Sequence, residues 1–139
     1  MILLSFLKNI EILVVEKAVA LTKERANTLS EIWPLCSYLF VRPNQYNEKS
    51  HKKIASALTV KILEELCIEI NDMELFKESC LSEAVKSWIN KNEYSFGSVM
   101  QPARLALVGE LKGIDLFLVM EFIGKEETIA RIVKLSKNI

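Results

Sequence analysis

The chain has 139 residues, of which half are hydrophobic and 26% are charged, and its 18 Lys and Arg residues balance 18 Asp and Glu residues. This composition excludes a disordered chain and a membrane-spanning one, and the length is enough to bury a real core. Because the net charge is zero, any contact with nucleic acid must come from a few placed side chains rather than from a broad basic surface.

The first predicted block is helical and runs from about residue 2 to residue 40. Its apolar start carries polar residues at three positions, which predicts an amphipathic helix and neither a signal peptide nor a membrane span. Apolar residues then recur at spacings of three and four, which predicts a helical stripe: Val14, Ala18, Leu21, Leu29 and Ile32. Pro34 interrupts this stripe, so the helix kinks or restarts there. Residues 41–47 form the predicted linker, because Pro43 keeps the residue before it out of the α region.

The second predicted block begins near Glu48 with one long helix, which ends at residues 71–72. Apolar residues repeat every four positions along this helix: Ile54, Leu58, Ile62, Leu66 and Ile70. Ser82 is the predicted N-cap of the next helix, because a serine hydroxyl can accept a hydrogen bond from a backbone N–H of the first turn.

Three shorter helices are predicted in the last third of the chain. The first begins with a capping box over residues 98–101 and stops at Gly109. The second covers residues 115–123 and stops at Gly124. The third has two glutamates in its first turn, where they complement the helix dipole. No segment alternates with a period of two, so the predicted fold class is all-α, in two consecutive helical bundles.

Few residues suggest catalysis or metal binding. His51 is the only histidine, and beside Lys52 and Lys53 it is interpreted as a solvated surface side chain without a catalytic partner. The sequence has no Gly-rich phosphate loop and no pair of residues with metal-ligand spacing, so no catalytic residue and no metal site is predicted. The three cysteines are far apart and are interpreted as reduced structural thiols of a cytoplasmic protein: Cys36, Cys67 and Cys80.

Two arginines lie on apolar helical stripes. Arg25 and Arg104 each have apolar residues four positions before and after them. Because a buried unpaired guanidinium is costly, each needs an anion, a hydrogen-bond partner or a groove. The spacing leaves open an internal salt bridge, a side chain that reaches solvent at the helix edge, and a planar fork for phosphates or base edges. A basic cluster at Lys49, Lys52 and Lys53 is either a solvated helix start or a phosphate contact.

The most specific pattern in the chain is the run GSVMQPARLALVG at residues 97–109. It is followed by KGIDLF at residues 112–117 and by IGKEETIARI at residues 123–132. Upstream, KERA occupies residues 23–26 and YNEK occupies residues 46–49. In this order and spacing the runs resemble the C-terminal, anticodon-binding region of bacterial-type glutamyl-tRNA synthetases, which are class I aminoacyl-tRNA synthetases.

The resemblance implies two domains and a function. Residues 1–45 would be the helical block that joins the catalytic part to the anticodon-binding domain, and residues 46–139 would be that domain. The HIGH-like and KMSKS-like motifs of the family's catalytic domain are absent here. We therefore expect no cofactor in this piece, with ATP and Mg²⁺ bound by the parent's catalytic domain. The implied function is recognition of a tRNA anticodon for a glutamate–tRNA ligase, without catalysis by this piece alone. Its partners would be the anticodon loop of glutamate tRNA and the parent's catalytic domain, and the protein would be a cytoplasmic monomer.

The resemblance also implies which residues contact RNA. Arg25 matches the arginine that reads the third anticodon base, and Arg104 matches the arginine that contacts the middle base. The loop around the first base is matched by Gly113, Ile114 and Leu116, with isoleucine where the family usually has proline. The apolar side chains of this loop are expected to contact a base face.

Lys49 and Lys53 complete the predicted RNA-binding set, as candidate phosphate contacts. A different interpretation is a helical protein–protein interaction module that has kept the fold and lost RNA binding. The zero net charge favours this alternative, and binding to an anticodon stem-loop distinguishes the two.

Overall fold

The chain divides into two compact units, Met1–Phe40 and Val41–Ile139. The computed structural model describes residues 16–20 and 36–139. In the first unit, residues 16–20 are helical and Ser37–Leu39 form a short 3-10 helix, η1, with Tyr38 and Leu39 buried. The predicted domain boundary, after residue 45, falls a few residues farther along the chain, and its functional meaning stays a prediction.

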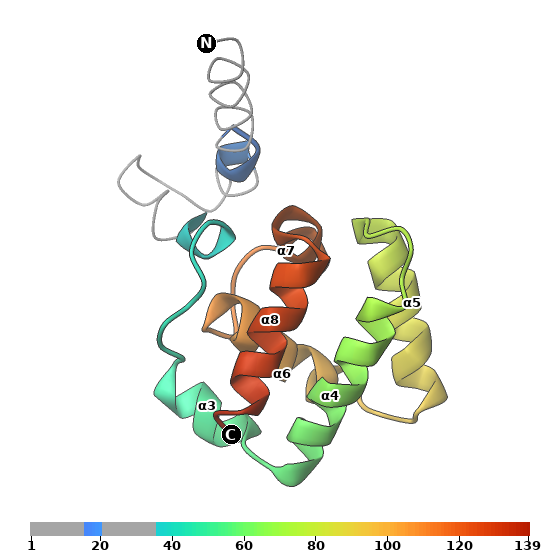
Figure 1. Ribbon diagram of the computed structural model, residues 1–139. Helices are drawn as coiled ribbons and strands as arrows, with labels where there is room; N and C mark the ends of the chain where they lie inside the picture. Colours follow the sequence, from blue (N-terminus) through green and yellow to red (C-terminus); the bar gives the residue numbers. More distant parts are fainter. Residues whose placement is uncertain (1–15, 21–35) are drawn as a thin grey trace. The chain divides into compact units, whose positions relative to one another are not determined.

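The second unit is built from six helices that follow one another along the chain (Figure 1). No strand occurs in the described residues, so the predicted all-α class is confirmed. The helices are α3 (Glu48–Ile54), α4 (Ala57–Asn71), α5 (Glu78–Lys91), α6 (Phe96–Val108), α7 (Leu116–Ile123) and α8 (Lys125–Ser136).

The core of the second unit lies where α4, α6 and α8 pack against one another. α5 packs against α7, and α3 packs against α6. The centre is aliphatic, with side chains at most 1% exposed: Ile62, Leu63, Leu66, Ile70, Leu105, Leu107, Ile132 and Leu135. Burying each such side chain stabilises the fold by roughly 1.5–3 kcal/mol. The core therefore holds α6, the helix of Arg104, against both α4 and α8.

The ends of α6 and α7 lie where the sequence predicts them. α6 ends at Val108, and Gly109 follows in the left-handed region with φ of 87°. α7 ends at Ile123, and Gly124 follows with φ of 88°. Both stops are confirmed, because a residue with a Cβ atom adopts such positive φ values only at a cost.

The long helix predicted from Glu48 is two helices, α3 and α4. Ser56 breaks it with extended backbone angles, and its hydroxyl caps α4 by accepting a hydrogen bond from Thr59 N at 3.1 Å. Leu58 does not belong to the buried face, because its side chain is 54% exposed. The four-residue repeat thus ran across a turn that the apolar pattern does not show.

Two predicted helix starts are also wrong. α6 begins three residues earlier than its predicted capping box, because Ser95 is the N-cap and accepts from Ser98 N at 3.2 Å. α5 begins at Glu78, so Ser82 lies inside the helix. The first N–H of α5 donates to Oε1 of Glu121 on α7 at 2.9 Å. A cap supplied by another helix has no local sequence signal.

The predicted linker lies against the C-terminal end of α6. Asn47 N donates to the carbonyl oxygen of Gly109 at 2.8 Å, and Lys134 Nζ of α8 donates to the carbonyl oxygen of Pro43 at 3.1 Å. A Cβ atom added to Gly109 would lie 3.1 Å from Gln45 O and 3.4 Å from Pro43 Cβ. The linker is therefore held against the end of α6 and against α8. The absence of a side chain at Gly109 permits the close approach of the linker backbone.

We expect Gly109→Ala to destabilise the second unit by about 1–3 kcal/mol, because the new Cβ meets both the positive φ and the linker backbone. Gly97→Ala is the matched control, since Gly97 lies inside α6 and its added Cβ would only touch Gln101 at 3.8 Å. That variant should be stabilised by roughly 0.5–1 kcal/mol. Urea unfolding followed by circular dichroism measures both, and equal effects of the two variants would contradict this account of Gly109.

Candidate nucleic-acid interface

Arg104 lies in the third turn of α6 and is half-buried. Its Nη1 donates a hydrogen bond to the carbonyl oxygen of Ile114 at 2.8 Å. This contact joins the helix to the loop between α6 and α7, and it uses one of the five N–H donors that a guanidinium carries. Arg104 therefore fixes the position of the loop that follows its own helix.

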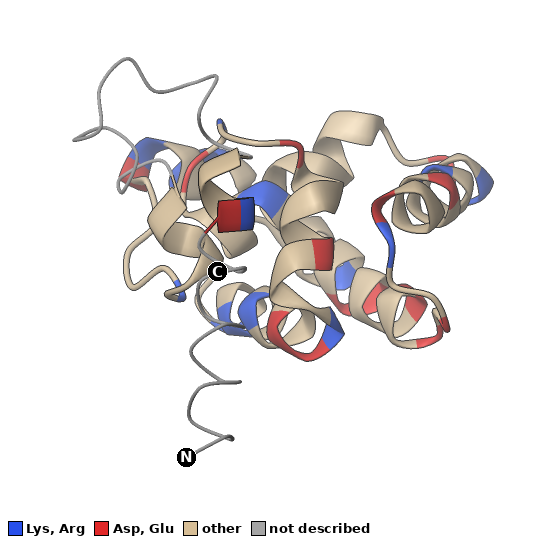
Figure 2. Cartoon of the chain, turned by 90° about the horizontal axis from the view of Figure 1, so that it is seen from above, with Lys and Arg blue, Asp and Glu red and all other residues tan. Residues whose placement is uncertain are grey.

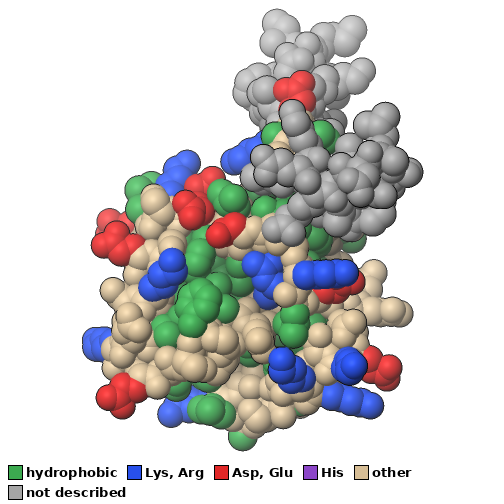
Figure 3. Space-filling view, turned by 180° about the vertical axis from the view of Figure 1, so that it is seen from behind, with side chains coloured by type: hydrophobic (Ala, Val, Ile, Leu, Met, Phe, Trp, Pro, Cys, Tyr) green, Lys and Arg blue, Asp and Glu red, His purple; other side chains and the backbone are tan. Residues whose placement is uncertain are grey.

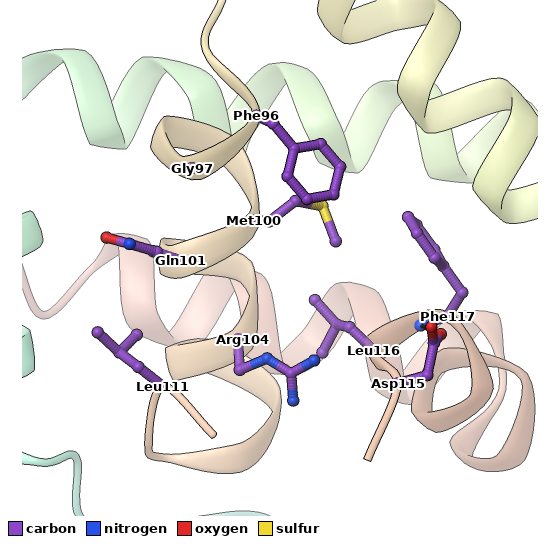
Figure 4. A pocket seen from close by; sticks show the side chains of 9 residues that line it. All are labelled: Phe96, Gly97, Met100, Gln101, Arg104, Leu111, Asp115, Leu116 and Phe117. Atoms are coloured by element: carbon purple, nitrogen blue, oxygen red, sulfur yellow. Dashed lines mark hydrogen bonds between the residues drawn. The ribbon is translucent and has the colours of Figure 1, made fainter. Parts of the chain in front are cut away.

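A groove of about 360 Å³ lies beside Arg104, between α6 and the start of α7 (Figure 4). Figure 4 shows the guanidinium of Arg104 pointing from α6 toward Leu116 and Asp115. Phe96 and Met100 line the groove from the first turns of α6. The groove thus combines a cation, a carboxylate and an aromatic ring within one small space.

Ile114 and Leu116 belong to the hydrophobic core, with side chains only 4% and 2% exposed. Their burial contradicts the expectation that these side chains offer an open apolar face to a base. Gly113 adopts φ of 139° between α6 and α7, a value that residues with a side chain rarely take. The buried pair and the glycine therefore shape the loop, and contact between this loop and RNA stays a prediction.

Lys49 and Lys53 lie on α3, and both are exposed. α3 is capped by Asn47, whose Oδ1 accepts from Ser50 N at 3.0 Å. Neither lysine lines the groove beside Arg104. The structure therefore places the predicted phosphate contacts on a different helix from the predicted base contact.

His51 is more enclosed than the sequence suggests. The residue is half-buried on α3, and its ring centroid lies 5.6 Å from that of Tyr46. Its Nε2 is buried and has no hydrogen-bond partner among the described residues. The interpretation of His51 as a solvated surface side chain is wrong, because the segment before α3 covers part of it.

Arg25 lies outside the described residues, so its predicted role stays a prediction. Trp88 is 9% exposed and packs edge-on against Tyr94 with ring centroids 5.7 Å apart, so it is part of the core. Positive and negative side chains are interspersed over the described helices (Figures 2 and 3). This distribution agrees with the zero net charge and leaves recognition to individual side chains.

A network of three charged side chains joins the linker to α8 and α6. Glu127 accepts hydrogen bonds from Arg42 Nε at 3.0 Å and Arg42 Nη2 at 2.9 Å. Arg131 Nε donates to Glu127 Oε2 at 2.7 Å, and Arg131 Nη1 donates to the carbonyl oxygen of Leu107 at 2.8 Å. Because Arg131 is only 2% exposed, Glu127 supplies the negative charge that a buried guanidinium needs.

The same contacts shift the titration of Glu127. Hydrogen bonds from Arg42 and then from Arg131 lower the pKa of Glu127 from 4.5 to about 2, against the opposite effect of burial. The folded-state pKa lies below the unfolded value. The carboxylate therefore stabilises the fold fully above about pH 4.5, and this contribution is lost as the pH falls toward about 2.

We expect the stability difference between wild type and Glu127→Gln to be largest at neutral pH and to shrink as the pH falls from about 4.5 toward 2. The variant cannot ionise at this position, so only the wild type should respond to protonation there. Urea unfolding of both proteins at pH 7, 4 and 3 measures the difference. A difference that stays constant over this range would show that Glu127 is not the linked group.

Sequence reasoning missed Arg131 and Lys125 as structural residues. The spacing of four between Glu127 and Arg131 is a signal for a helical ion pair, but it does not show that the arginine is buried. Lys125 Nζ donates to the carbonyl oxygens of Asn71, at 3.2 Å, and of Met73. The conspicuous run at residues 123–132 thus includes residues that hold the fold together.

The cysteines of the described part are free thiols. Cys36 is buried, and Cys67 and Cys80 are half-buried. Burial, and then the charge of Glu64, raises the pKa of Cys67 to about 11, so this thiol stays protonated at neutral pH. In residues 16–20 and 36–139, no three His, Cys, Asp or Glu side chains gather closely enough to hold a metal ion. Over the same described ranges, no helix has the length and apolar character needed to cross a membrane.

Comparison with known proteins gives consistent matches. A family model described as "Anticodon binding domain" matches residues 3–135. The glutamate–tRNA ligase of Flavobacterium psychrophilum is 43% identical over 118 residues, which cover 85% of this chain and 23% of the ligase. That of Flavobacterium johnsoniae is 44% identical over 121 residues, which cover 87% of this chain and 24% of the ligase.

Solved structures agree with the sequence matches. The crystal structure of a glutamate tRNA ligase from Elizabethkingia meningosepticum, in complex with its amino acid, matches with a TM-score of 0.81 and 39% identity. The match covers 87% of this chain and 24% of that one. The synthetase of Elizabethkingia anophelis matches with a TM-score of 0.74 and 39% identity. The chain thus spans about a quarter of the length of the relatives that it matches.

Proposed function

Because the chain belongs to the anticodon binding domain family and matches the anticodon-binding region of glutamate–tRNA ligases, we propose that it recognises the anticodon loop of glutamate tRNA. Single unpaired bases are the usual targets when a protein reads RNA sequence, because their edges are accessible. Arg104 reads the middle base in this proposal, and Arg25 reads the third. The loop at Gly113–Leu116 lies near the first anticodon base in the same proposal.

The observation that supports the proposal most is the groove beside Arg104. A guanidinium that is half-buried and hydrogen-bonded to Ile114 O is held in one orientation, and it borders a space of about 360 Å³. A fixed planar fork discriminates between hydrogen-bonding edges better than a mobile cation does. Lys49 and Lys53 supply phosphate contacts in this proposal, and their small number implies a shallow dependence of affinity on salt.

We also propose the context in which this piece works. The parent is a cytoplasmic, monomeric glutamate–tRNA ligase, and its catalytic domain, with ATP and Mg²⁺, is the partner of this chain. The matching regions of the Flavobacterium ligases are about a quarter of each protein, which leaves room for such a domain. This chain then contributes recognition and no chemical step.

Binding of RNA stem-loops tests the proposal. We expect the full chain to bind a stem-loop with the glutamate anticodon more tightly than one with a scrambled loop of the same length, as measured by fluorescence anisotropy at two salt concentrations. The alternative, a protein–protein interaction module without RNA binding, is favoured by the even mixture of charges on the described helices. Equal, weak binding of both RNAs would support that alternative and contradict the proposal.

A further inference from the structure

Phe96 is an exposed aromatic residue at the first position of α6. Its side chain is 51% exposed and lines the groove together with Met100 and Arg104. Ser95 caps the helix at this point, so the backbone of Phe96 is fixed by the helix start. The groove therefore has an aromatic border that the fold holds in place and leaves partly open to solvent.

Asp115 borders the same groove from the start of α7 (Figure 4). Its Oδ1 caps α7 by accepting from Phe117 N at 2.9 Å and from Leu118 N at 3.3 Å. Both hydrogen bonds use the same oxygen, and the residue is exposed. Oδ2 can therefore accept a hydrogen bond from a ligand while the cap stays intact.

The charges around the groove indicate what kind of group fits it. A phosphate site would be basic throughout, because a carboxylate such as that of Asp115 repels a phosphate. A nucleobase is planar and uncharged, and its edge carries both donors and acceptors. Its face can stack on an aromatic side chain. The volume of about 360 Å³ falls within the range of roughly 300–1,000 Å³ that is usual for small-ligand sites.

We propose that the groove holds one unpaired nucleobase, whose face stacks on Phe96 and whose edge donates an N–H to Asp115. An acceptor atom next to this N–H on the same base edge accepts a hydrogen bond from Arg104. Three residues, rather than one arginine, therefore determine which base binds. This inference rests on the proposed function, because it names the part of the RNA that enters the groove. It adds Phe96 and Asp115 to the recognition site.

Stacking is tested with Phe96→Ala. The variant should bind the anticodon stem-loop about 5- to 150-fold more weakly than wild type, the usual loss for one stacked base. Phe96→Trp should retain binding, because it keeps an aromatic face. When the base that enters the groove is replaced by an abasic nucleotide, wild type and Phe96→Ala should bind alike. Ile68→Ala is the control, since Ile68 is 65% exposed on α4 and does not line the groove.

Edge recognition is tested with Asp115→Asn. Asparagine caps a helix about as well as aspartate, so the thermal midpoint should be unchanged. The substitution places an NH₂ donor where Oδ2 accepted, and binding of the preferred base should weaken about 5- to 150-fold. The loss should vanish on the same abasic stem-loop that abolishes the effect of Phe96→Ala. Asp115→Ala should lower the thermal midpoint as well, because it removes the cap.

The outcomes separate this inference from the function on which it rests. Losses that disappear for both variants at one and the same abasic position support the inference. If wild type distinguishes anticodons but either variant binds every RNA as wild type does, or weakens equally on every RNA, the inference is overturned and the proposed function stands. If wild type does not distinguish the stem-loop from a scrambled loop, both are overturned together.

Discussion

Replacing Glu127 by alanine should destabilise the second unit by about 3 kcal/mol, near the lower end of the cost of breaking a buried ion pair. The reason is that Arg131, which is only 2% exposed, loses the carboxylate that accepts the hydrogen bond from its Nε. Its hydrogen bond to the carbonyl oxygen of Leu107 carries no compensating charge. The lower end applies because about a third of the Glu127 side chain is exposed. Urea unfolding at pH 7 measures the effect.

Glu126→Ala provides the matched control for this prediction. Glu126 lies in the same first turn of α8 and is exposed, so its loss removes only a favourable interaction with the helix dipole, worth a few tenths of a kcal/mol to about 1 kcal/mol. Arg42→Ala should have a small effect too, because Arg42 is 43% exposed and Glu127 keeps Arg131. If Glu127→Ala costs no more than Glu126→Ala, Arg131 does not depend on this carboxylate.

The helix ends that the sequence predicts correctly are those with a local cause. Gly109 and Gly124 stop α6 and α7 because the chain there requires positive φ values, and glycine adopts them most easily. Asp115 starts α7 because its carboxylate accepts two N–H groups of the first turn. Each cause lies within a few residues of its effect, so a sequence pattern can show it.

Other features that the sequence misses depend on residues far apart in the chain. α5 starts where Glu121 of another helix accepts its first N–H, and no pattern near Glu78 reveals that contact. The spacing of four residues between Glu127 and Arg131 indicates only a helical ion pair. The structure shows that Arg131 is buried and donates to the carbonyl oxygen of Leu107. Tertiary packing decides these cases, whereas local propensity is nearly neutral.

The residues of the candidate site also divide into those that the sequence predicts and those that it misses. The helical spacing singles out Arg104 as an arginine that needs a partner, and the structure supplies the carbonyl oxygen of Ile114. The spacing could not show that Ile114 and Leu116 turn inward, because an apolar residue in a loop suits either a ligand or the core. Phe96 was missed because an aromatic residue at the first position of a helix has no characteristic pattern.

The second large effect is expected from Arg104→Ala in RNA binding. The variant should lose about 1–3 kcal/mol of binding free energy for the preferred base at one anticodon position, the scale of one good base contact. The fold should survive, because Arg104 is half-buried and its hydrogen bond to the carbonyl oxygen of Ile114 is worth about 1 kcal/mol. Thermal unfolding of the variant, measured alongside binding, separates loss of recognition from loss of structure.

The most direct test of this account is the affinity of the full chain for anticodon stem-loops in which each anticodon base is changed in turn, measured for wild type and for Arg104→Ala. Wild type should prefer the glutamate anticodon at every position. Arg104→Ala should lose that preference mainly at the middle base, with other positions and thermal stability little changed. Equal weakening on every RNA would make Arg104 a phosphate contact. Identical binding by wild type and variant would remove it from the site and contradict the account.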